Sequence, residues 1–261
     1  MLFSIITVCY NSAKTVRRTI ESVLNQTCQD YEYIIVDGKS TDKTLDIIKE
    51  YENRFGGKLR YISEPDTGIY NAMNKGIRLS EGSIIGIVNS DDWLQSDALE
   101  IVKGYADKMD VPLFIISGWM NFHYKNGIVQ RLTNSYERFE RITKRYGMGL
   151  RHPATFVSAS VYRQVGKFDE NLKISADREF IIRCYKQCNI KINIISEILT
   201  NMSDGGISEQ QQTQKLIRDS IYIYKKHTSS RFEYLYLFGL YKVRLYIKQM
   251  LPVSLKRKLR H

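Results

Sequence analysis

The sequence lacks any long hydrophobic run and has few cysteines. No stretch approaches the ~20 consecutive apolar residues that a membrane-spanning helix needs. Apolar rather than basic residues open the chain, so we expect no signal peptide. Cys184 and Cys188 are four residues apart, but Cys9, Cys28 and the histidines form no second pair beside them. Reduced thiols in a reducing cytosol are therefore expected, rather than a zinc site.

Acidic residues are scarce near the end of the chain. Residues 215–261 hold twelve Lys and Arg against two Asp and Glu, which accounts for +10 of the total net charge of +11. The rest of the chain is nearly neutral, and this distribution indicates a basic appendage rather than a general nucleic-acid-binding surface. The sequence also has no internal repeat and no low-complexity linker.

The first half of the chain alternates short β-branched apolar runs with amphipathic helical patterns. This order predicts an α/β fold with a parallel, doubly wound sheet and right-handed crossovers. Asn11 or Ser12 is expected to cap the first helix. Strands are expected at 1–8, 31–36, 59–62, 83–88 and 113–117, and helices at 16–24, 45–51, 70–79 and 96–108.

From residue 119 the pattern changes to that of a small antiparallel extension. Asn126-Gly127 predicts a β-hairpin, because this dipeptide supplies the positive φ that such turns need. The sequence predicts a body over 1–208, dividing near residue 118, and a separate tail over 209–261. Further elements are expected as strands at 119–124, 128–132, 154–157, 190–195 and 198–202, and as helices at 135–144 and from 176.

Two adjacent carboxylates, Asp91 and Asp92, follow the expected strand at 83–88. In open α/β sheets, ligands bind at the carboxyl ends of strands. Such a pair is tolerated where a divalent cation or hydrogen-bond donors lie beside it. Mg²⁺ takes carboxylate oxygens and usually shares its shell with substrate phosphates. The alternative is a helix N-cap, and the doublet alone leaves both interpretations open.

Residues 209–261 predict a basic, aromatic helical tail. Residues 209–228 have the pattern of a polar helix, and from Phe232 onward Tyr and Leu are interspersed with Lys and Arg. Tyr and basic residues on an apolar helix suit the interface of an anionic membrane, so we expect the tail to dock there. Packing of the tail on the body is the alternative, and RNA binding is a weaker third option.

The motifs, taken in order, resemble those of glycosyltransferase family 2. This family comprises inverting nucleotide-sugar transferases with the GT-A fold, and the resemblance covers about residues 3–208. The stretch from Gly68 to Gly76 is most similar to the branch that builds bacterial surface polysaccharides. The motifs are Val8-Cys9-Tyr10-Asn11, Val36 to Asp42, Glu64 to Gly76, Asn89-Ser90-Asp91-Asp92, His152 to Phe156, Phe168-Asp169-Glu170 and Ala176-Asp177.

The resemblance implies a role for single residues. Asp92 would reach Mn²⁺ or Mg²⁺, and Asp177 would be the general base that takes the proton of an acceptor hydroxyl. Glu179 is a rival base, but two residues further along a helix it points about 200° away from Asp177. The donor nucleotide would be bound by Thr7, Tyr10, Asp37, Asp66 and Asp91, with Tyr10 stacking on the base.

Further diphosphate or acceptor contacts are implied for Lys75, Arg151 and His152, and for a turn that contains Gly206 and Ser208. A structural histidine and solvated basic side chains are the alternatives. Three positions depart from the family pattern, because Gly38, Asn89 and Ala176 stand where acids are usual. Gly38 leaves the identity of the donor base open.

The predicted function is metal-dependent, inverting transfer of a sugar from a nucleotide-diphosphate sugar, with a UDP-sugar favoured, to a glycan or lipid-linked acceptor. The enzyme is expected to be cytoplasmic and peripheral on the inner face of the membrane, with no nucleic-acid partner. One alternative is a catalytically degenerate scaffold that binds nucleotide or membrane. A nucleotidylyltransferase is a weaker alternative, because residues 8–13 hold none of the glycines of such a signature.

Overall fold

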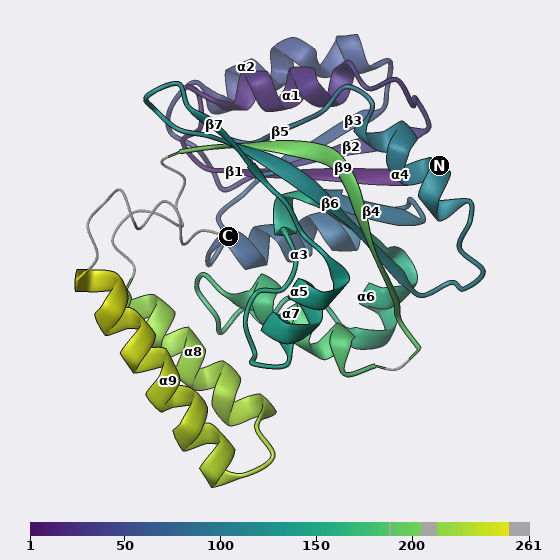
Figure 1. The fold of residues 1–261 in the computed structure, drawn as a ribbon. Helices are drawn as coiled ribbons and strands as arrows, with labels where there is room; N and C mark the ends of the chain where they lie inside the picture. Colours follow the sequence, from purple (N-terminus) through teal and green to yellow (C-terminus); the bar gives the residue numbers. More distant parts are fainter. Residues whose placement is uncertain (188, 205–212, 251–261) are drawn as a thin grey trace.

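The computed structural model describes residues 1–187, 189–204 and 213–250 (Figure 1). Three parts of the sequence that carried predictions lie outside these ranges. They are Cys188, the turn with Gly206 and Ser208, and the basic end of the chain at 251–261.

The strands of the described residues form one nine-stranded sheet. They are β1 (Phe3–Cys9), β2 (Tyr31–Asp37), β3 (Leu59–Ser63), β4 (Ile84–Ile87), β5 (Trp93–Leu94), β6 (Phe114–His123), β7 (Val129–Leu132), β8 (Thr155–Ser158) and β9 (Lys191–Ser203). Their order is β3-β2-β1-β4-β8-β6-β9-β5, with β7 beside β6. The first four strands in this order are parallel, and β8 is antiparallel to both of its neighbours. The half of the sheet formed by β3, β2, β1 and β4 is thus parallel, and the second half is mixed.

Helices cover both faces of this sheet (Figure 1). α1, α2 and α4 lie on one face, and α3, α5, α6 and α7 lie on the other. Their bounds are α1 (Val16–Leu24), α2 (Thr44–Glu52), α3 (Ile69–Leu79), α4 (Ala98–Ala106), α5 (Tyr136–Thr143), α6 (Ala159–Val165) and α7 (Ala176–Tyr185), with short 3₁₀ turns at Asn53–Phe55 and His152–Ala154.

The two faces explain why β1 is buried along its whole length, including the polar Ser4 and Thr7. Phe3 and Ile5 pack into the core under α1, α2 and α4, whereas Ile6 and Val8 pack into the core under α3. A strand buried on both sides cannot alternate apolar and polar residues. The predicted doubly wound α/β fold is confirmed.

The prediction of two strands at 190–195 and 198–202 was wrong, because β9 is continuous. Ser196-Glu197 suggested a break between two apolar runs. Instead, the ladder between β9 and β6 continues past these residues in parallel orientation. Tyr105 donates a hydrogen bond of 2.8 Å to the Glu197 carboxylate, so a polar side chain is accommodated in the strand.

Gly118 marks an irregularity in β6, where the register with β9 shifts. A Cβ added at Gly118 would lie 2.6 Å from Leu199 Cγ and 2.7 Å from the carbonyl oxygen of Glu197. Only glycine lets the two strands approach this closely without displacing a neighbour. The predicted division near residue 118 therefore falls inside one strand.

The predicted cap of the first helix was also wrong. α1 begins at Val16 with Thr15 as its N-cap residue, and neither Asn11 nor Ser12 caps it with a side chain. Asn11 has a positive φ of 50°, and its Oδ1 accepts a hydrogen bond of 2.8 Å from the Thr41 N–H. The Asn11 side chain thus ties the loop after β1 to the loop after β2.

The tail forms a helical hairpin of α8 (Thr213–His227) and α9 (Arg231–Met250) that packs on the body (Figure 1). Ile223, Tyr224 and Leu237 are buried in the same core as α3 and α7. In the structure the tail therefore packs on the body, which was the alternative to membrane docking. No helix in the described ranges is long and apolar enough to cross a membrane.

One face of α9 stays exposed even though the opposite face is packed. Phe232 is 86% exposed and Tyr236 is 67% exposed. The exposed stripe consists of Phe232, Leu235, Tyr236, Leu240 and Val243. These positions recur at helical spacing, so α9 is apolar on two sides.

A buried ionic cluster joins α8 to α7. Glu179 is fully buried and accepts bonds from Arg183 Nε at 2.8 Å, Lys226 Nζ at 3.0 Å and His227 Nε2 at 3.0 Å. Lys226 also contacts Asp169 at 2.7 Å. Burial alone would raise the pKa of Glu179, but the hydrogen bond from His227 and the charge of Arg183 outweigh it and lower the pKa to about 2.

We predict that Glu179→Gln lowers the free energy of unfolding at neutral pH by about 3 kcal/mol, since a pKa unit is worth about 1.4 kcal/mol. The folded-state pKa is depressed, so this contribution is present above pH ~4.5 and is lost as the pH falls towards ~2. Urea denaturation at pH 7 and pH 3 measures it. The variant should destabilise the protein strongly at pH 7 and much less at pH 3.

Glu100→Gln on α4 is the matched control, because Glu100 is exposed. It should change stability by no more than about 0.5 kcal/mol at either pH. Equal losses in the two variants would contradict a stabilising role for the buried cluster.

Candidate active site

The loops that follow β1 and β4 meet at the carboxyl ends of these strands. β1 and β4 are parallel neighbours, so their ends lie at the same edge of the sheet. The hydroxyl oxygens of Ser12 and Ser90 lie 2.8 Å apart. This contact brings the Asp91-Asp92 doublet beside the end of β1, as expected from the strand order.

Asp92 is buried completely at this edge. Its Oδ2 accepts a hydrogen bond of 3.2 Å from Asn89 Nδ2, whereas its buried Oδ1 meets no hydrogen-bond donor in the described part of the chain. Burial, followed by the charge of Asp91, raises the pKa of Asp92 well above its ordinary value. Burial also raises the pKa of Asp91. The pair is therefore strained in its ionised form.

Arg18, on α1, is a site residue that sequence reasoning missed. Its Nη2 donates to the carbonyl oxygen of Asp91 at 2.9 Å and to Ser203 Oγ at 2.6 Å. Its guanidinium carbon lies 3.6 Å from the centroid of the Trp93 ring. Burial lowers the pKa of Arg18, and the charges of Asp92 and Asp91 oppose this shift. The sequence pattern of α1 did not indicate this role, because Arg18 lies outside the apolar face and therefore looks like an ordinary surface arginine.

The donor chemistry around Asp92 fits a hard divalent cation. Asp92 Oδ1 and Asn89 Oδ1 are buried oxygens without a hydrogen-bond partner among the described residues. No group of three His, Cys, Asp or Glu gathers in those residues. Mg²⁺ nevertheless commonly binds through one or two carboxylates together with substrate phosphates, which is the arrangement this doublet offers.

Asp66 and Tyr10 meet above Gly38. A Cβ added at Gly38 would lie 2.5 Å from Asp66 Oδ2 and 3.4 Å from Tyr10 Cδ2. Tyr10 is 61% exposed, and Asp66 Oδ1 accepts a bond of 2.9 Å from the Gly68 N–H. The Asp66 carboxylate therefore occupies the space into which an acid at position 38 would project.

Asp37 and Thr7 lie behind this surface. The Asp37 carboxylate is fully buried and accepts bonds from the Ser40 N–H at 3.0 Å and from Ser63 Oγ at 2.6 Å. Thr7 is also buried, and its hydroxyl accepts a bond of 2.9 Å from Tyr33. In this structure both residues hold the strand ends in place, and Tyr10 and Asp66 form the accessible surface.

Asp177 lies in the first turn of α7, and its Oδ1 accepts hydrogen bonds from Tyr70 Oη at 3.0 Å and from the Arg178 N–H at 2.8 Å. Glu179 points away into the buried ionic cluster, as the helical geometry predicts. His152 is half-buried and packs edge-on against Phe168. Burial lowers the pKa of His152, and the charge of Asp177 opposes that shift.

The predicted basic contacts are engaged with the protein in the described structure. Lys75 Nζ donates to the carbonyl of Pro65 at 2.7 Å and lies 2.9 Å from the Glu64 carboxylate. Arg151 donates to the carbonyl of Thr133 at 3.2 Å, and burial lowers its pKa to about 10. Gly206 and Ser208 lie outside the described residues.

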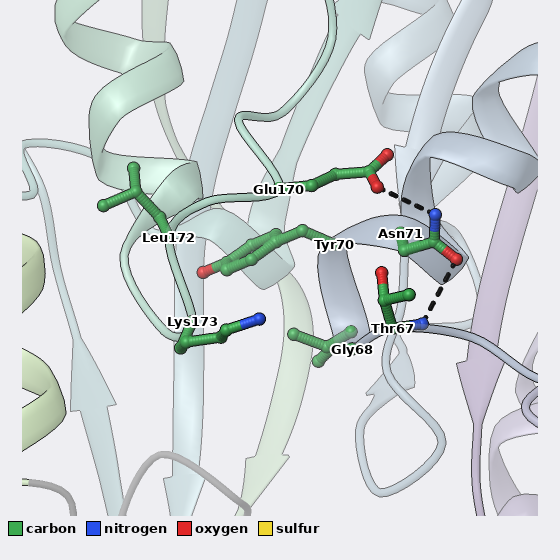
Figure 2. Close-up of a pocket in the computed structure, with 8 residues that line it drawn as sticks. Thr67, Gly68, Tyr70, Asn71, Glu170, Leu172 and Lys173 are labelled. Carbon is green, nitrogen blue, oxygen red and sulfur yellow. Dashed lines mark hydrogen bonds between the residues drawn. The ribbon is translucent and has the colours of Figure 1, made fainter.

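A small pocket opens between the start of α3 and the loop before α7 (Figure 2). One side is formed by Thr67 and Asn71, and the other by Glu170 and Lys173. Asn71 Nδ2 donates to the Glu170 carboxylate at 2.8 Å and bridges the two sides. Tyr70 lines the same pocket, so the pocket adjoins the Asp177 carboxylate.

We predict that Asp92→Asn stabilises the protein in the absence of ligands. The amide retains an acceptor for Asn89 and removes a buried charge beside Asp91. Relief of such strain is typically worth about 0.5–2 kcal/mol. In a chain of this size, each kcal/mol raises the midpoint of thermal unfolding by about 2–4 °C.

The measurement is thermal unfolding at neutral pH, with a chelator present. Asp97→Asn is the control, because Asp97 is exposed on the same segment and should leave the midpoint unchanged. A lower midpoint for Asp92→Asn would show that this carboxylate is not strained.

Residues 4–166 match the family model described as Glycosyl transferase family 2. The chain is also 28% identical, over 214 residues, to a protein of Mycobacterium tuberculosis named as a PGL/p-HBAD biosynthesis glycosyltransferase. That alignment covers 79% of this chain and 79% of the relative.

The fold resembles those of solved glycosyltransferase structures, among them the following two. S. aureus TarS 1–349 in complex with UDP-GlcNAc has a TM-score of 0.68 at 18% identity, over 97% of this chain and 77% of that one. The mannosyltransferase PcManGT from Pyrobaculum calidifontis, in complex with GDP-Man and Mn²⁺, has a TM-score of 0.63 at 13% identity, over 91% and 68%. Since the family match spans more than half of the sequence and the fold agrees with it, the chain belongs to glycosyl transferase family 2 and is a sugar-transferring enzyme with a GT-A-like fold.

Proposed function

We propose that the protein is an inverting transferase that moves a sugar from a nucleotide-diphosphate donor to the hydroxyl of a glycan or a lipid-linked acceptor. The observation that carries this proposal is the presence of two separate carboxylate centres. Asp91 and Asp92 form a strained pair at the end of β4, and Asp177 is held by Tyr70 at the start of α7. One centre suits the donor diphosphate, and the other suits the acceptor.

The proposed donor is a UDP-sugar. Tyr10 presents an exposed ring for stacking on a base, and the Asp66 carboxylate beside it is an acceptor for base or ribose hydrogen bonds. Asp91, Thr7 and Asp37 are proposed to complete this site, since Ser90 beside Asp91 contacts Ser12 in the loop after β1. The TarS structure with UDP-GlcNAc supports this choice, whereas the mannosyltransferase with GDP-Man makes guanosine the competing base.

In the proposed reaction, the acceptor hydroxyl attacks the anomeric carbon from the face opposite the diphosphate. The hydroxyl proton passes to the Asp177 carboxylate as the new C–O bond forms, and the bond to the diphosphate breaks with inversion. Asp92 would hold Mn²⁺ or Mg²⁺, which would neutralise charge on the departing nucleotide, and Asp91 would face the nucleotide's ribose. Arg18, whose guanidinium bonds the Asp91 carbonyl, would keep this segment in position. His152 and the pocket beside Tyr70 are the proposed contacts for the acceptor.

Lys75 and Arg151 remain proposed anion contacts. Lys75 would have to exchange its ion pair with Glu64 for a phosphate. Arg151 is half-buried, and its buried Nε has no hydrogen-bond partner among the described residues. Gly206 and Ser208 also remain proposed diphosphate or acceptor contacts.

The acceptor is proposed to belong to surface polysaccharide or glycolipid synthesis at the inner face of the membrane. The relative named for PGL/p-HBAD biosynthesis supports this class. The exposed stripe on α9 and the strongly basic tail suit adsorption to an anionic lipid surface, where an amphipathic helix buries its apolar face. The body, 1–208, would then hold the chemistry, and the tail, 209–261, would set its location.

We predict that UDP raises the midpoint of thermal unfolding more than GDP or CMP, and that Mn²⁺ increases the effect. Asp92→Asn should abolish the increase due to Mn²⁺. Asp177→Asn should keep the full UDP response but lower the rate of UDP release from UDP-GlcNAc by about 10²- to 10⁴-fold. Thermal unfolding with each nucleotide and a coupled assay for UDP measure the two effects.

The outcomes separate the parts of the proposal. An Asp177→Asn enzyme with normal turnover would eliminate Asp177 as the base. A response to GDP alone would change the donor. A folded protein that responds to no nucleotide would support a catalytically inactive scaffold instead.

We predict that the protein cosediments with vesicles rich in phosphatidylglycerol and not with phosphatidylcholine vesicles. Replacing Phe232 and Tyr236 together by Ser should weaken this binding by at least about tenfold, because each large apolar side chain contributes about 1.5–3 kcal/mol on burial. High salt should weaken binding of the unmodified protein as well.

The matched control replaces Ile128 and Val129 together by Ser. These residues are also exposed and apolar, but they lie on the β6–β7 hairpin. Equal binding by both double variants would contradict docking through α9.

A further inference from the structure

The polar residues of α3 face the acceptor side of the molecule, a feature that donor binding does not explain. Asn74 is buried, and its Nδ2 donates to the carbonyl of Phe168 at 2.9 Å and to the Glu170 carboxylate at 2.8 Å. Its Oδ1 accepts a bond of 3.0 Å from the Phe168 N–H. Asn74 thus satisfies both backbone groups of one residue in the segment before α7.

Tyr70 lies on the same face of α3, one turn earlier. A spacing of four residues places two side chains one above the other on a helix. The Tyr70 ring packs against Phe168 with centroids 5.6 Å apart, and its hydroxyl donates to Asp177 Oδ1 at 3.0 Å. Burial, followed by the charge of Asp177, raises the pKa of Tyr70 well above its ordinary value, so the phenol remains a donor.

We propose that Tyr70 is a positioning residue for Asp177, and that with Asn74 it aligns the proposed base with the acceptor hydroxyl. This inference rests on the proposed role of Asp177. The hydrogen bonds from Tyr70 and from the Arg178 N–H both reach Oδ1. Within the described residues Oδ2 accepts no hydrogen bond, so this oxygen is left to receive the proton.

A fixed orientation matters because a general base acts only within hydrogen-bond reach of the proton that it takes. An aspartate in the first turn of a helix has several rotamers, and the Arg178 N–H alone defines a single contact. The Tyr70 hydroxyl comes from another helix, 107 positions away in the chain. Two donors on one oxygen restrict rotation of the carboxylate about its Cβ–Cγ bond.

The test is Tyr70→Phe, which deletes one hydroxyl and keeps the packing against Phe168. We expect kcat for UDP release from UDP-GlcNAc, with octyl glucoside or water as the acceptor, to fall about 10- to 100-fold. The Kd for UDP and the midpoint of thermal unfolding should stay unchanged. A loss in kcat without a loss in donor affinity is what a positioning role predicts.

Tyr162→Phe is the matched control. Tyr162 belongs to the same aromatic cluster, with its ring 6.1 Å from Phe168 and 4.8 Å from Phe180. Its hydroxyl makes no hydrogen bond to Asp177, and the control variant should keep normal kcat. A normal kcat for Tyr70→Phe, or an equal fall in both variants, would overturn the proposal.

A double variant separates this inference from the proposed function. If Tyr70 acts through Asp177, then Tyr70→Phe should lower kcat no further in an Asp177→Asn background. A further fall of the same size would overturn the positioning role while leaving the base assignment intact. Full activity of Asp177→Asn alone would instead overturn the proposed function.

A second measurement is independent of turnover. Crystal structures of the unmodified protein and of Tyr70→Phe, determined at the same pH, should differ in the orientation of the Asp177 carboxylate. An unchanged carboxylate would overturn the proposal.

Discussion

The buried carboxylate of Asp92 is the constraint on which the arrangement of the strand ends depends. A charge in this position is unfavourable by itself, and Asp91 makes it more so. The surrounding elements stabilise this charge only in part. Asn89 donates a hydrogen bond to Asp92 Oδ2, and Arg18 on α1 donates one to the Asp91 carbonyl oxygen. One oxygen still has no donor within the described residues. Function and stability therefore oppose each other here, and a bound cation with its diphosphate would relieve the conflict.

α3 connects the proposed donor edge to the proposed acceptor side, and two glycines, Gly68 and Gly76, allow this connection. Gly68 has a φ of 141°, which favours glycine, and it ends the loop that carries Asp66. A Cβ added at Gly76 would lie 2.5 Å from Ile6 Cγ2, so glycine lets α3 lie directly against β1. A helix attached this closely to the central strand is a rigid base for Tyr70. The spacing of Gly76, Tyr70 and Asn74 in this helix thus follows from three separate contacts. Gly76 lies against Ile6, Tyr70 bonds Asp177, and Asn74 bonds the backbone of Phe168.

Local patterns in the sequence were enough to predict most of the fold, whereas contacts across the chain were not predictable. The apolar strands and the Asp91-Asp92 doublet depend on neighbours in sequence, and the structure places them as expected. The continuity of β9 depends on its pairing with β6, which outweighs the polar Ser196-Glu197. The roles of Arg18 and Tyr70 depend on partners 73 and 107 positions away. Single-sequence patterns carry no information about such pairs, so an arginine that bonds a distant carbonyl cannot be told from a solvated one.

The contacts between the tail and the body were likewise not predictable from local sequence patterns, and they link the tail to the segment before α7. Composition suggested an appendage, but Asp219 on α8 accepts hydrogen bonds from the Lys173 and Ile174 N–H groups at 3.0 and 2.9 Å. These residues immediately precede α7, which carries Asp177. Since the same hairpin presents the exposed stripe of α9, a lipid surface held there would have a defined orientation relative to Asp177. Docking would then do more than concentrate the enzyme at the membrane, because it would also set the direction from which a lipid-linked hydroxyl reaches Asp177, the proposed base.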